Sequence, residues 1–290
     1  MRGTATWIVA GAVLVLVVVA VADGIRNHAD ASGAQAPAPR ILHGIMVTAD
    51  AGCQTHAFRL PSLAAEHAPH PPDCNGRKWS QDGSIVARCN GDFTSVRTSG
   101  GVQFPNVDGC APAWREDGAL SVVRDGNIVI ARRHGAPFIV FSRPQLTEAL
   151  GAAGVDDAGA WRLAQVSWFG LTSFVAILEK RGDSAAAVFA QGGLETFVPR
   201  IGAHIEDLRA SPIGNFAFAR VDPEREYAML SRGGDPIGLP TVRGATAIAW
   251  SPDERYVAIS TDDATVVART GTTKAIATLP FGARALDWLT

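Results

Sequence analysis

The 290-residue chain lacks a strong excess of either charge. Its 26 basic and 28 acidic residues give a formal net charge of −2, and the basic residues, nearly all Arg, form no run of five or more. A chain of this kind creates no long-range field that attracts nucleic acid or anionic lipid. We therefore expect no nucleic-acid partner, while the length is ample for one large hydrophobic core.

Motifs for catalysis and cofactor binding are also missing. The sequence has no G-x-S-x-G nucleophile turn, no P-loop and no H-E-x-x-H zinc motif. The adjacent carboxylates Asp156 and Asp157 suit a loop better than an acid–base pair, whose members must face one another across a substrate. We expect no cofactor, and the sequence favours a role without catalysis while leaving an enzyme open.

Cysteine is sparse and confined to one region. Cys53, Cys74, Cys89 and Cys110 are the only four, and none belongs to a C-x-x-C pair. A zinc site built from all four is therefore disfavoured. An even, clustered set indicates disulfides in an oxidising compartment, with reduced structural thiols as the alternative.

Apart from the cysteines, possible metal ligands cluster in only one segment of the sequence. Glu66, His67, His70 and Asp73 lie close together, but three prolines in the same segment favour an extended loop. No helix would present the two imidazoles on one face, so we expect no metal site there.

A long apolar run occupies the N-terminus. Arg2 precedes an uncharged stretch of 19 residues, 4–22, close to the ~20 residues that span a bilayer. The favoured interpretation is an uncleaved transmembrane signal anchor at 1–22, and the alternative is a signal peptide cleaved after Ala20-Val21-Ala22. The first predicts a single-pass cell-membrane protein whose C-terminal domain lies outside the cytoplasm, and the second a secreted protein.

A flexible linker follows at 23–40. This segment is rich in Ala, Ser, Gly and Pro and has no apolar periodicity. It cannot bury enough surface to fold and should behave as a semi-extended tether. From Ile41 onward, short alternating runs bounded by turn residues continue to the C-terminus, which predicts one domain over 41–290.

A short phrase repeats through this domain. It begins at Trp79, Trp114 and Trp250, and each copy consists of a strand ending in Trp, a polar turn and a second alternating strand. We interpret the Asp residues of the phrase as hairpin-turn residues rather than acid–base groups. The equivalent positions 79, 114, 168, 210, 250 and 288 are spaced by 35, 54, 42, 40 and 38 residues.

A period near 40 residues with four short strands per unit is typical of β-propeller blades. We therefore predict an all-β, six-bladed β-propeller, preceded by one transmembrane helix. Its last blade would be split, because strand 283–288 needs partners that strands 44–49 and 54–60 can supply. This closure by N- and C-terminal strands would remove two exposed sheet edges.

The cysteine spacing fits the same register. Cys53 and Cys74 are 21 residues apart, as are Cys89 and Cys110, and the two pairs are offset by 36 residues, about one blade. In each blade the two cysteines would lie in loops on the same face. Of the three possible connectivities, we predict Cys53–Cys74 and Cys89–Cys110.

The phrases at 250–258 and 79–87 resemble the WD-like repeat of TolB-type propellers, and the resemblance covers roughly residues 41–290. Two units, beginning at Trp168 and Ala210, lack the Asp of the turn. The resemblance implies a binding scaffold in the bacterial envelope, with another envelope protein as the partner.

An insertion interrupts the repeat between Trp114 and Trp168. Pro144 in the first turn and Gly151 at the end predict a short helix, followed by a loop. Long loops on a rigid scaffold often carry function. The candidate interaction loop therefore contains Arg143, Gln145, Glu148, Asp156 and Asp157.

Two functional hypotheses follow. The first is a membrane-tethered, extracytoplasmic propeller that acts as a protein-interaction or sensing scaffold. The second is a small-ligand binder or hydrolase that uses one propeller face, with the 143–161 insertion as a lid. A structural alternative for the insertion is a helix that covers the channel end or a blade edge.

Overall fold

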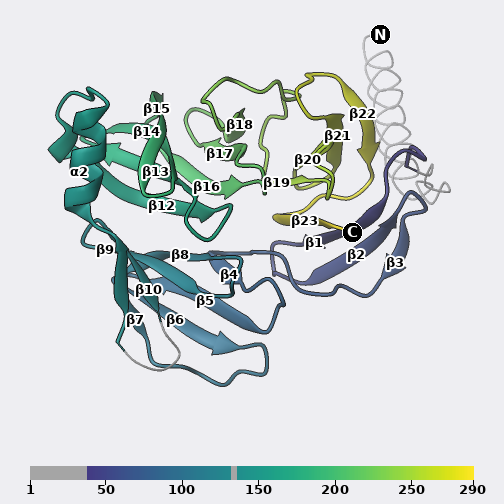
Figure 1. The fold of residues 1–290 in the computed structure, drawn as a ribbon. Helices are drawn as coiled ribbons and strands as arrows, with labels where there is room; N and C mark the ends of the chain where they lie inside the picture. The colour runs from purple at the N-terminus through teal and green to yellow at the C-terminus, as the bar shows by residue number, and fades with distance from the viewer. Residues whose placement is uncertain (1–37, 132–135) are drawn as a thin grey trace, which may run out of the picture. The chain divides into compact units, whose positions relative to one another are not determined.

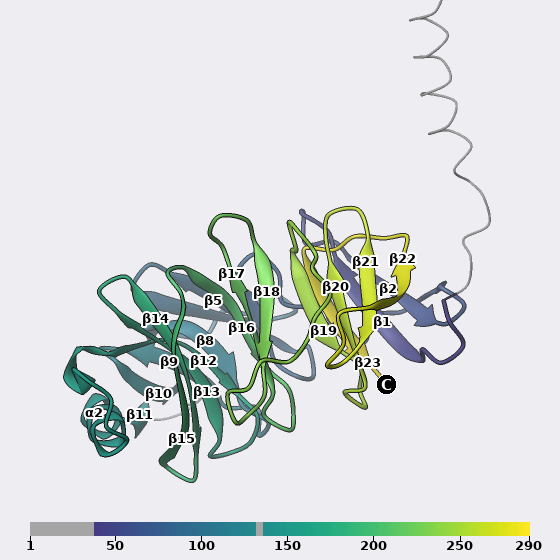
Figure 2. The same ribbon diagram turned by 90° about the horizontal axis from the view of Figure 1, so that it is seen from above.

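The computed structural model describes residues 38–131 and 136–290 (Figures 1 and 2). The compact domain begins at Ala38, whose backbone N–H donates to the carbonyl of Pro61. The predicted membrane segment at 1–22 and the linker as far as residue 37 lie outside the described residues. Within the described ranges, no helix is long and apolar enough to cross a membrane.

Within the described residues, the domain contains six antiparallel sheets, five with four strands and one with three. Sheet 1 contains β1 (Gly44–Ala49), β2 (Thr55–Leu60), β3 (Ala64–Glu66) and β23 (Ala285–Leu289). Sheet 2 contains β4 (Arg77–Trp79), β5 (Ile85–Asn90), β6 (Phe93–Thr98) and β7 (Val107–Asp108). Sheet 3 contains β8 (Cys110–Trp114), β9 (Leu120–Arg124), β10 (Asn127–Ala131) and β11 (Phe138–Phe141).

The other three sheets follow in chain order. Sheet 4 contains β12 (Arg162–Trp168), β13 (Phe174–Lys180), β14 (Asp183–Ala190) and β15 (Gly193–Gly202). Sheet 5 contains β16 (Ile205–Ala210), β17 (Phe216–Arg220) and β18 (Glu226–Leu230). Sheet 6 contains β19 (Ala247–Trp250), β20 (Tyr256–Ser260), β21 (Thr265–Arg269) and β22 (Ala275–Leu279).

Sheet 1 is assembled from both ends of the domain. The C-terminal strand β23 pairs with β1, from Ile45 opposite Leu289 to Ala49 opposite Ala285. This is the strand partnership that the split repeat predicts. It places the first strand of the domain in the interior of a sheet rather than at an edge.

The repeated phrase forms a tight hairpin whose polar residues bond to one another. The Ser251 hydroxyl donates to Asp253 Oδ1 at 2.7 Å and accepts the Tyr256 backbone N–H at 2.9 Å. The same pattern recurs in sheet 2, where the Ser80 hydroxyl donates to Asp82 at 2.6 Å. Bonds from the hydroxyls of Ser80 and Ser84 and from the Ser84 backbone N–H lower the pKa of Asp82 to about 2. The aspartates of the phrase therefore stabilise turns.

The hydrophobic core lies between neighbouring sheets. Sheets 3 and 4, 4 and 5, 5 and 6, and 6 and 1 each share a cluster of buried apolar side chains, and a smaller one joins sheets 2 and 3. Between sheets 1 and 2, in contrast, the buried cluster consists of Ala49, Ala285 and Cys74, with Cys53 packed against it. This junction has the thinnest apolar packing of those described and is braced by a disulfide.

Candidate functional site

A cavity of about 610 Å³ lies where one strand from each of the six sheets converges. Each of these strands ends at or next to a repeat position, and we call them the first strands of the sheets. Strands β4, β8, β12, β16, β19 and β23 each contribute lining residues. The residue just before each repeat position lies in this lining: Lys78, Ala113, Ser167, Arg209, Ala249 and Asp287. The residues at the repeat positions also line the cavity: Trp79, Trp114, Trp168, Ala210, Trp250 and Trp288.

Alternating charges cross this cavity. Lys78 Nζ lies 3.1 Å from Asp73 Oδ2 and 4.0 Å from Asp207 Oδ1. The Arg209 guanidinium lies 3.2 Å from Asp207 and 3.3 Å from Asp287. Sheets 1, 2 and 5 are thus connected through a chain of ion pairs. Each charge in this chain has an opposite partner, which is the usual condition for burying ionised groups.

The pKa values follow from burial and from these partners. Burial alone would raise the pKa of Asp207, but Arg209 and Lys78 outweigh it and hold that pKa well below its usual range. Burial raises the pKa of Asp287 to about 6, against the lowering effect of Arg209. The pKa of Asp287 is therefore well above the ordinary value of an aspartate.

Tyr227 completes the network on the sheet 5 side. Its hydroxyl donates to Asp207, and burial followed by the Asp207 charge raises the pKa of the phenol. Arg209 Nη1 also donates to the carbonyl of Leu286 at 2.9 Å. These bonds tie β16 to β18 and β23, so the network has a clear structural role.

The tryptophans at the repeat positions fix strands to one another, two of them between neighbouring sheets and Trp288 within sheet 1. Trp114 Nε1 donates to the carbonyl of Lys78 in sheet 2, and Trp168 Nε1 donates to the Ser121 hydroxyl in sheet 3, both at 2.8 Å. Trp288 Nε1 donates to the carbonyl of His43 at 2.8 Å. This agrees with the interpretation of these residues as packing groups rather than exposed stacking platforms.

Trp250 departs from that pattern. Its Nε1 is buried and has no hydrogen-bond partner within the described part of the chain. In sheet 3, Ser121 lies opposite Ala113, whereas in sheet 5 Ala217 lies opposite Arg209. Ala217 of sheet 5 thus occupies the position equivalent to Ser121 of sheet 3. It has no hydroxyl that could accept the indole N–H of Trp250.

The turns after the first strands surround one end of the cavity, and we call this side of the domain the turn face. It carries Ser80, Arg115, Leu171, Ile213 and Glu254. Arg115 Nη1 donates to the Leu171 carbonyl at 3.2 Å, and the Ile213 backbone N–H donates to Glu254 Oε1 at 3.3 Å. Neighbouring turns are therefore bonded to one another.

Apolar side chains are exposed at two adjacent turns of this face. Leu171 is 48 % exposed and Ile213 is 62 % exposed. The two turns touch, because a Cβ added at Gly214 would lie 3.0 Å from the Phe169 ring. They are the two turns in which the repeat lacks its Asp. The exposed apolar side chains thus lie in the turns that lack the Asp of the repeat.

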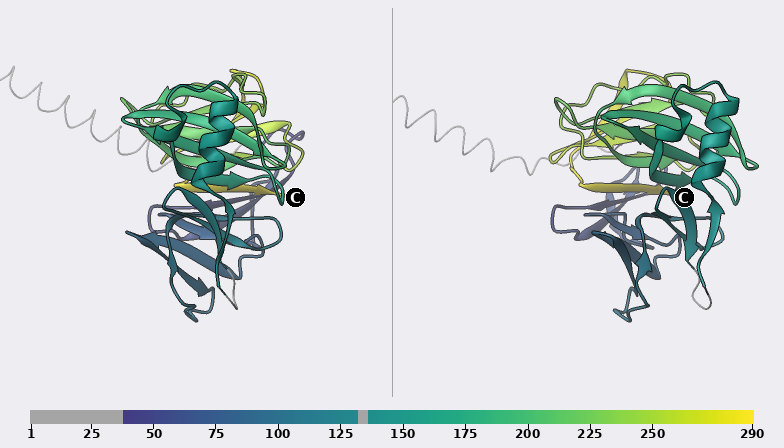
Figure 3. Two further views of the ribbon diagram at one scale, coloured as in Figure 1. Left: turned by 60° about the vertical axis from the view of Figure 1, so that its left-hand side comes forward. Right: turned by 90° about the vertical axis from the view of Figure 1, so that its left-hand side faces the viewer.

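The 143–161 insertion lies elsewhere. It forms α2 (Arg143–Ala152) and the short helix η1 (Ala158–Ala160), at the outer side of sheet 4 (Figure 3). Leu146 and Leu150 are fully buried against Phe141 and Phe189 of sheets 3 and 4. No residue of 143–161 lines the cavity. The structure therefore places the insertion over the outer part of sheets 3 and 4.

The five candidate residues of the insertion have different surroundings. Gln145 forms a capping box with Ser142 at the start of α2, and the backbone N–H of Arg143 donates to Asn127 Oδ1 at 2.9 Å. Asp157 lies 3.6 Å from Lys180 Nζ. Glu148 and Asp156 are exposed. The structure does not gather these side chains into one site.

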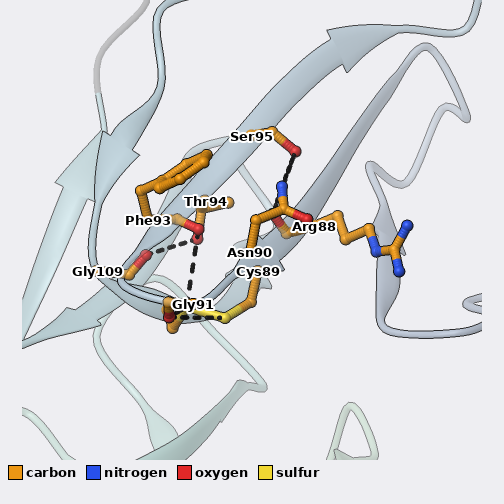
Figure 4. The surroundings of a disulfide bond; sticks show 9 residues. Arg88, Cys89, Asn90, Gly91, Phe93, Thr94, Ser95 and Gly109 are labelled. Atoms are coloured by element: carbon orange, nitrogen blue, oxygen red, sulfur yellow. Dashed lines mark hydrogen bonds between the residues drawn. A yellow bond between two sulfur atoms is a disulfide. The ribbon is translucent and has the colours of Figure 1, made fainter.

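Two disulfides join Cys53 to Cys74 and Cys89 to Cys110, the pairs that the spacing predicts. Cys89 lies in β5 and Cys110 in β8, so the second bond links sheets 2 and 3 (Figure 4). In the Glu66–Asp73 segment, Glu66 pairs with Arg59 at 2.5 Å. Among the described residues, no group of three or more His, Cys, Asp or Glu side chains could hold a metal ion.

Comparison with known proteins supports the fold but identifies no family. No family model and no curated protein matches the sequence. Among solved structures, the β-propeller domain of Cps50 (Swd1) from Myceliophteria thermophila is similar, with a TM-score of 0.50, 11 % identity and coverage of 85 % of this chain and 90 % of that chain. The Dos1 propeller matches with a TM-score of 0.44, 12 % identity and coverage of 86 % and 75 %.

The class of the protein follows from the fold. The described chain is all-β apart from its short helices, and its sheets match those of a β-propeller domain over most of both chains. At this level of identity the likeness shows the fold alone. The chain thus has a propeller-type fold.

Proposed function

We propose that the chain is a six-bladed β-propeller that acts as a protein-interaction scaffold and binds its partner on the turn face. Six sheets whose first strands share one cavity support the blade count. The pairing of β23 with β1 supports closure by the two chain ends. The turn phrases at 79–87 and 250–258 support the TolB-type assignment.

The observation that carries this proposal is the exposed apolar pair on the turn face. Leu171 and Ile213 are exposed in adjacent turns that lie in contact, and each of these turns is hydrogen-bonded to its other neighbour. Exposed apolar side chains that cluster on such a surface are typical of protein contacts. In contrast, the charges of the cavity pair with one another, and this favours a structural role for the cavity.

The proposed setting is the bacterial cell envelope, with the domain outside the cytoplasm and another envelope protein as the partner. The apolar run at 4–22 supports a membrane tether or an export signal. Two disulfides support an oxidising compartment.

A second candidate function is the binding of a small ligand in the cavity. One observation favours it: Asp287, with a pKa raised to about 6, lies in a cavity of about 610 Å³. The insertion does not reach that cavity, so a lid formed by 143–161 would require a large rearrangement of buried Leu146 and Leu150.

Co-purification from detergent-solubilised membranes tests the scaffold function. The full chain is compared with a Leu171→Ser/Ile213→Ser variant and with a control, Ile276→Ser, whose apolar side chain is 37 % exposed on β22. We expect the same partner with the wild type and the control, and its loss from the double variant. Retention of that partner by the double variant would contradict binding on the turn face.

A further inference from the structure

A second, smaller groove of about 370 Å³ lies on one face of sheet 2. Three adjacent strands each contribute an arginine to it: Arg77 from β4, Arg88 from β5 and Arg97 from β6. Gln103 and Asn106 also line it, and no acidic residue is among its lining residues. The groove is therefore rich in hydrogen-bond donors and carries positive charge.

The register of sheet 2 brings these charges together. Arg77 lies directly opposite Arg88 in the β4–β5 pair. Arg88 lies opposite Ser95, so Arg97, two residues further along β6, is its diagonal neighbour on the same face. Like charges that lie directly opposite in a sheet are destabilising. The fold thus keeps an arrangement that costs stability.

No ion pair within residues 38–131 and 136–290 relieves this repulsion. Within the described ranges, the ion pairs involve other arginines, such as Arg59, Arg115 and Arg209, and none involves the three arginines of the groove. In addition, Arg77 Nε is buried and has no hydrogen-bond partner there. A buried guanidinium N–H without an acceptor is unfavourable, so the position of Arg77 carries a further cost to stability.

The groove stays open because sheet 2 packs through its other face. Ala87, on the opposite face, joins the apolar cluster with Leu120 of sheet 3. On the side of sheet 1, the shared cluster is confined to the surroundings of the Cys53–Cys74 disulfide. Arg88 and Arg97 are exposed, and Arg77 is half-buried. A ligand in the groove can therefore reach Arg88, Arg97 and the accessible part of Arg77.

Two disulfides fix the strands that carry the arginines. Cys74 forms a β-bridge with Arg77, and Cys89 directly follows Arg88 in β5. In Figure 4 the Arg88 side chain extends away from the sulfur atoms, and Asn90 Nδ2 donates to Ser95 Oγ at 2.7 Å. The charged groups are thus held on a braced surface before any ligand binds.

We propose that this groove is a binding site for a phosphate group. Three guanidinium groups on adjacent strands offer forked donors to the oxygens of a phosphate group, and their positive charge complements its negative charge. The side-chain amides of Gln103 and Asn106 add neutral donors at the rim. The phosphate belongs either to a soluble phosphate ester or to the headgroup of an anionic phospholipid.

Calorimetry and thermal unfolding of the full chain in detergent test the site. The probes are inorganic phosphate, dihexanoyl phosphatidylglycerol and, as a zwitterionic control, dihexanoyl phosphatidylcholine. We expect Arg77→Gln to weaken binding at least about tenfold, while Arg162→Gln, which alters an exposed arginine of sheet 4, leaves it unchanged. Binding of inorganic phosphate assigns the site to soluble esters, and binding of phosphatidylglycerol alone assigns it to the lipid headgroup.

A second readout separates the site from mere surface charge. Without phosphate, Arg77→Gln should raise Tm because it removes the repulsion with Arg88. With phosphate, the Tm of the wild type should rise and that of Arg77→Gln should not. The proposal is overturned if neither anion binds, or if Arg77→Gln and the wild type bind phosphate equally.

Discussion

At the scale of single residues, the hydroxyl of Ser121 connects two sheets. It donates to the carbonyl of Ala113 at 3.0 Å and accepts the indole N–H of Trp168 at 2.8 Å. We expect Ser121→Ala to lower the free energy of unfolding by about 1–3 kcal/mol, because it leaves the indole N–H without its acceptor.

Urea unfolding of this variant is compared with Ser62→Ala, which removes an exposed hydroxyl. The control should change the free energy of unfolding by no more than about 0.5 kcal/mol. If the two variants are equally stable, the Trp168–Ser121 bond does not stabilise the junction between sheets 3 and 4.

Asp287 predicts a particular dependence of stability on pH. Its pKa in the folded protein is about 6, above the ordinary value of 3.8 for the unfolded chain. Between these values the folded state binds more protons, so this residue makes the free energy of unfolding fall as pH rises from about 4 to about 6. The effect is at most about 3 kcal/mol, and water screening reduces it because the side chain is 28 % exposed.

Thermal unfolding between pH 4 and pH 7 tests this effect. The wild type should become less stable as pH rises through this range, and Asp287→Asn should lack this decrease. The control variant Asp156→Asn, at an exposed position, should show the same decrease as the wild type. Asp207 has a lowered pKa and therefore affects stability in the opposite sense. It stabilises the folded protein when ionised, and this stabilisation is lost only in more acidic solution. An unchanged slope in Asp287→Asn would contradict the raised pKa.

At the scale of elements, helix α2 is part of the core. Leu146 and Leu150 are fully buried, while Glu148 is exposed. We expect Leu146→Ala to lower the free energy of unfolding by about 2–5 kcal/mol, as for other large-to-small changes in cores. Glu148→Ala should change it by about 0.5 kcal/mol or less. Similar chemical-denaturation midpoints for the two variants would show that α2 does not contribute to the core.

The strands and turns of this fold could largely be predicted from sequence, because their signals are local. Trp250 ends a first strand, Asp253 bonds within the turn, and a second strand starts at Tyr256. The helix at 144–150 was also recognisable from Pro144 and Gly151, although it extends over Arg143–Ala152. Its position over sheets 3 and 4 depends on tertiary packing and gives no local signal.

The ion-pair network could not be predicted in the same way. Lys78, Arg209 and Asp287 come from separate sheets, and only the convergence of the first strands brings them together. Their common position, one residue before the repeat position, was nevertheless visible in the sequence. That position could have indicated which charged side chains meet in the cavity.

At the scale of the whole molecule, the six sheets differ in how firmly they join their neighbours. Large apolar clusters join sheets 3 to 6 and sheet 1, whereas sheets 1 and 2 share a small cluster around Cys53–Cys74. The two surfaces proposed for binding also differ. The turn face offers apolar side chains for a protein, and the groove of sheet 2 offers arginines for an anion.

The central claim is that the turn face binds a protein partner. Site-specific photo-crosslinking in the native membrane tests it most directly, with a photoreactive residue at position 213 and a control at position 276. We expect one discrete crosslinked partner from position 213, competed away by unlabelled protein, and none from position 276. The absence of a crosslink at 213, or the same partner from both positions, would contradict the claim.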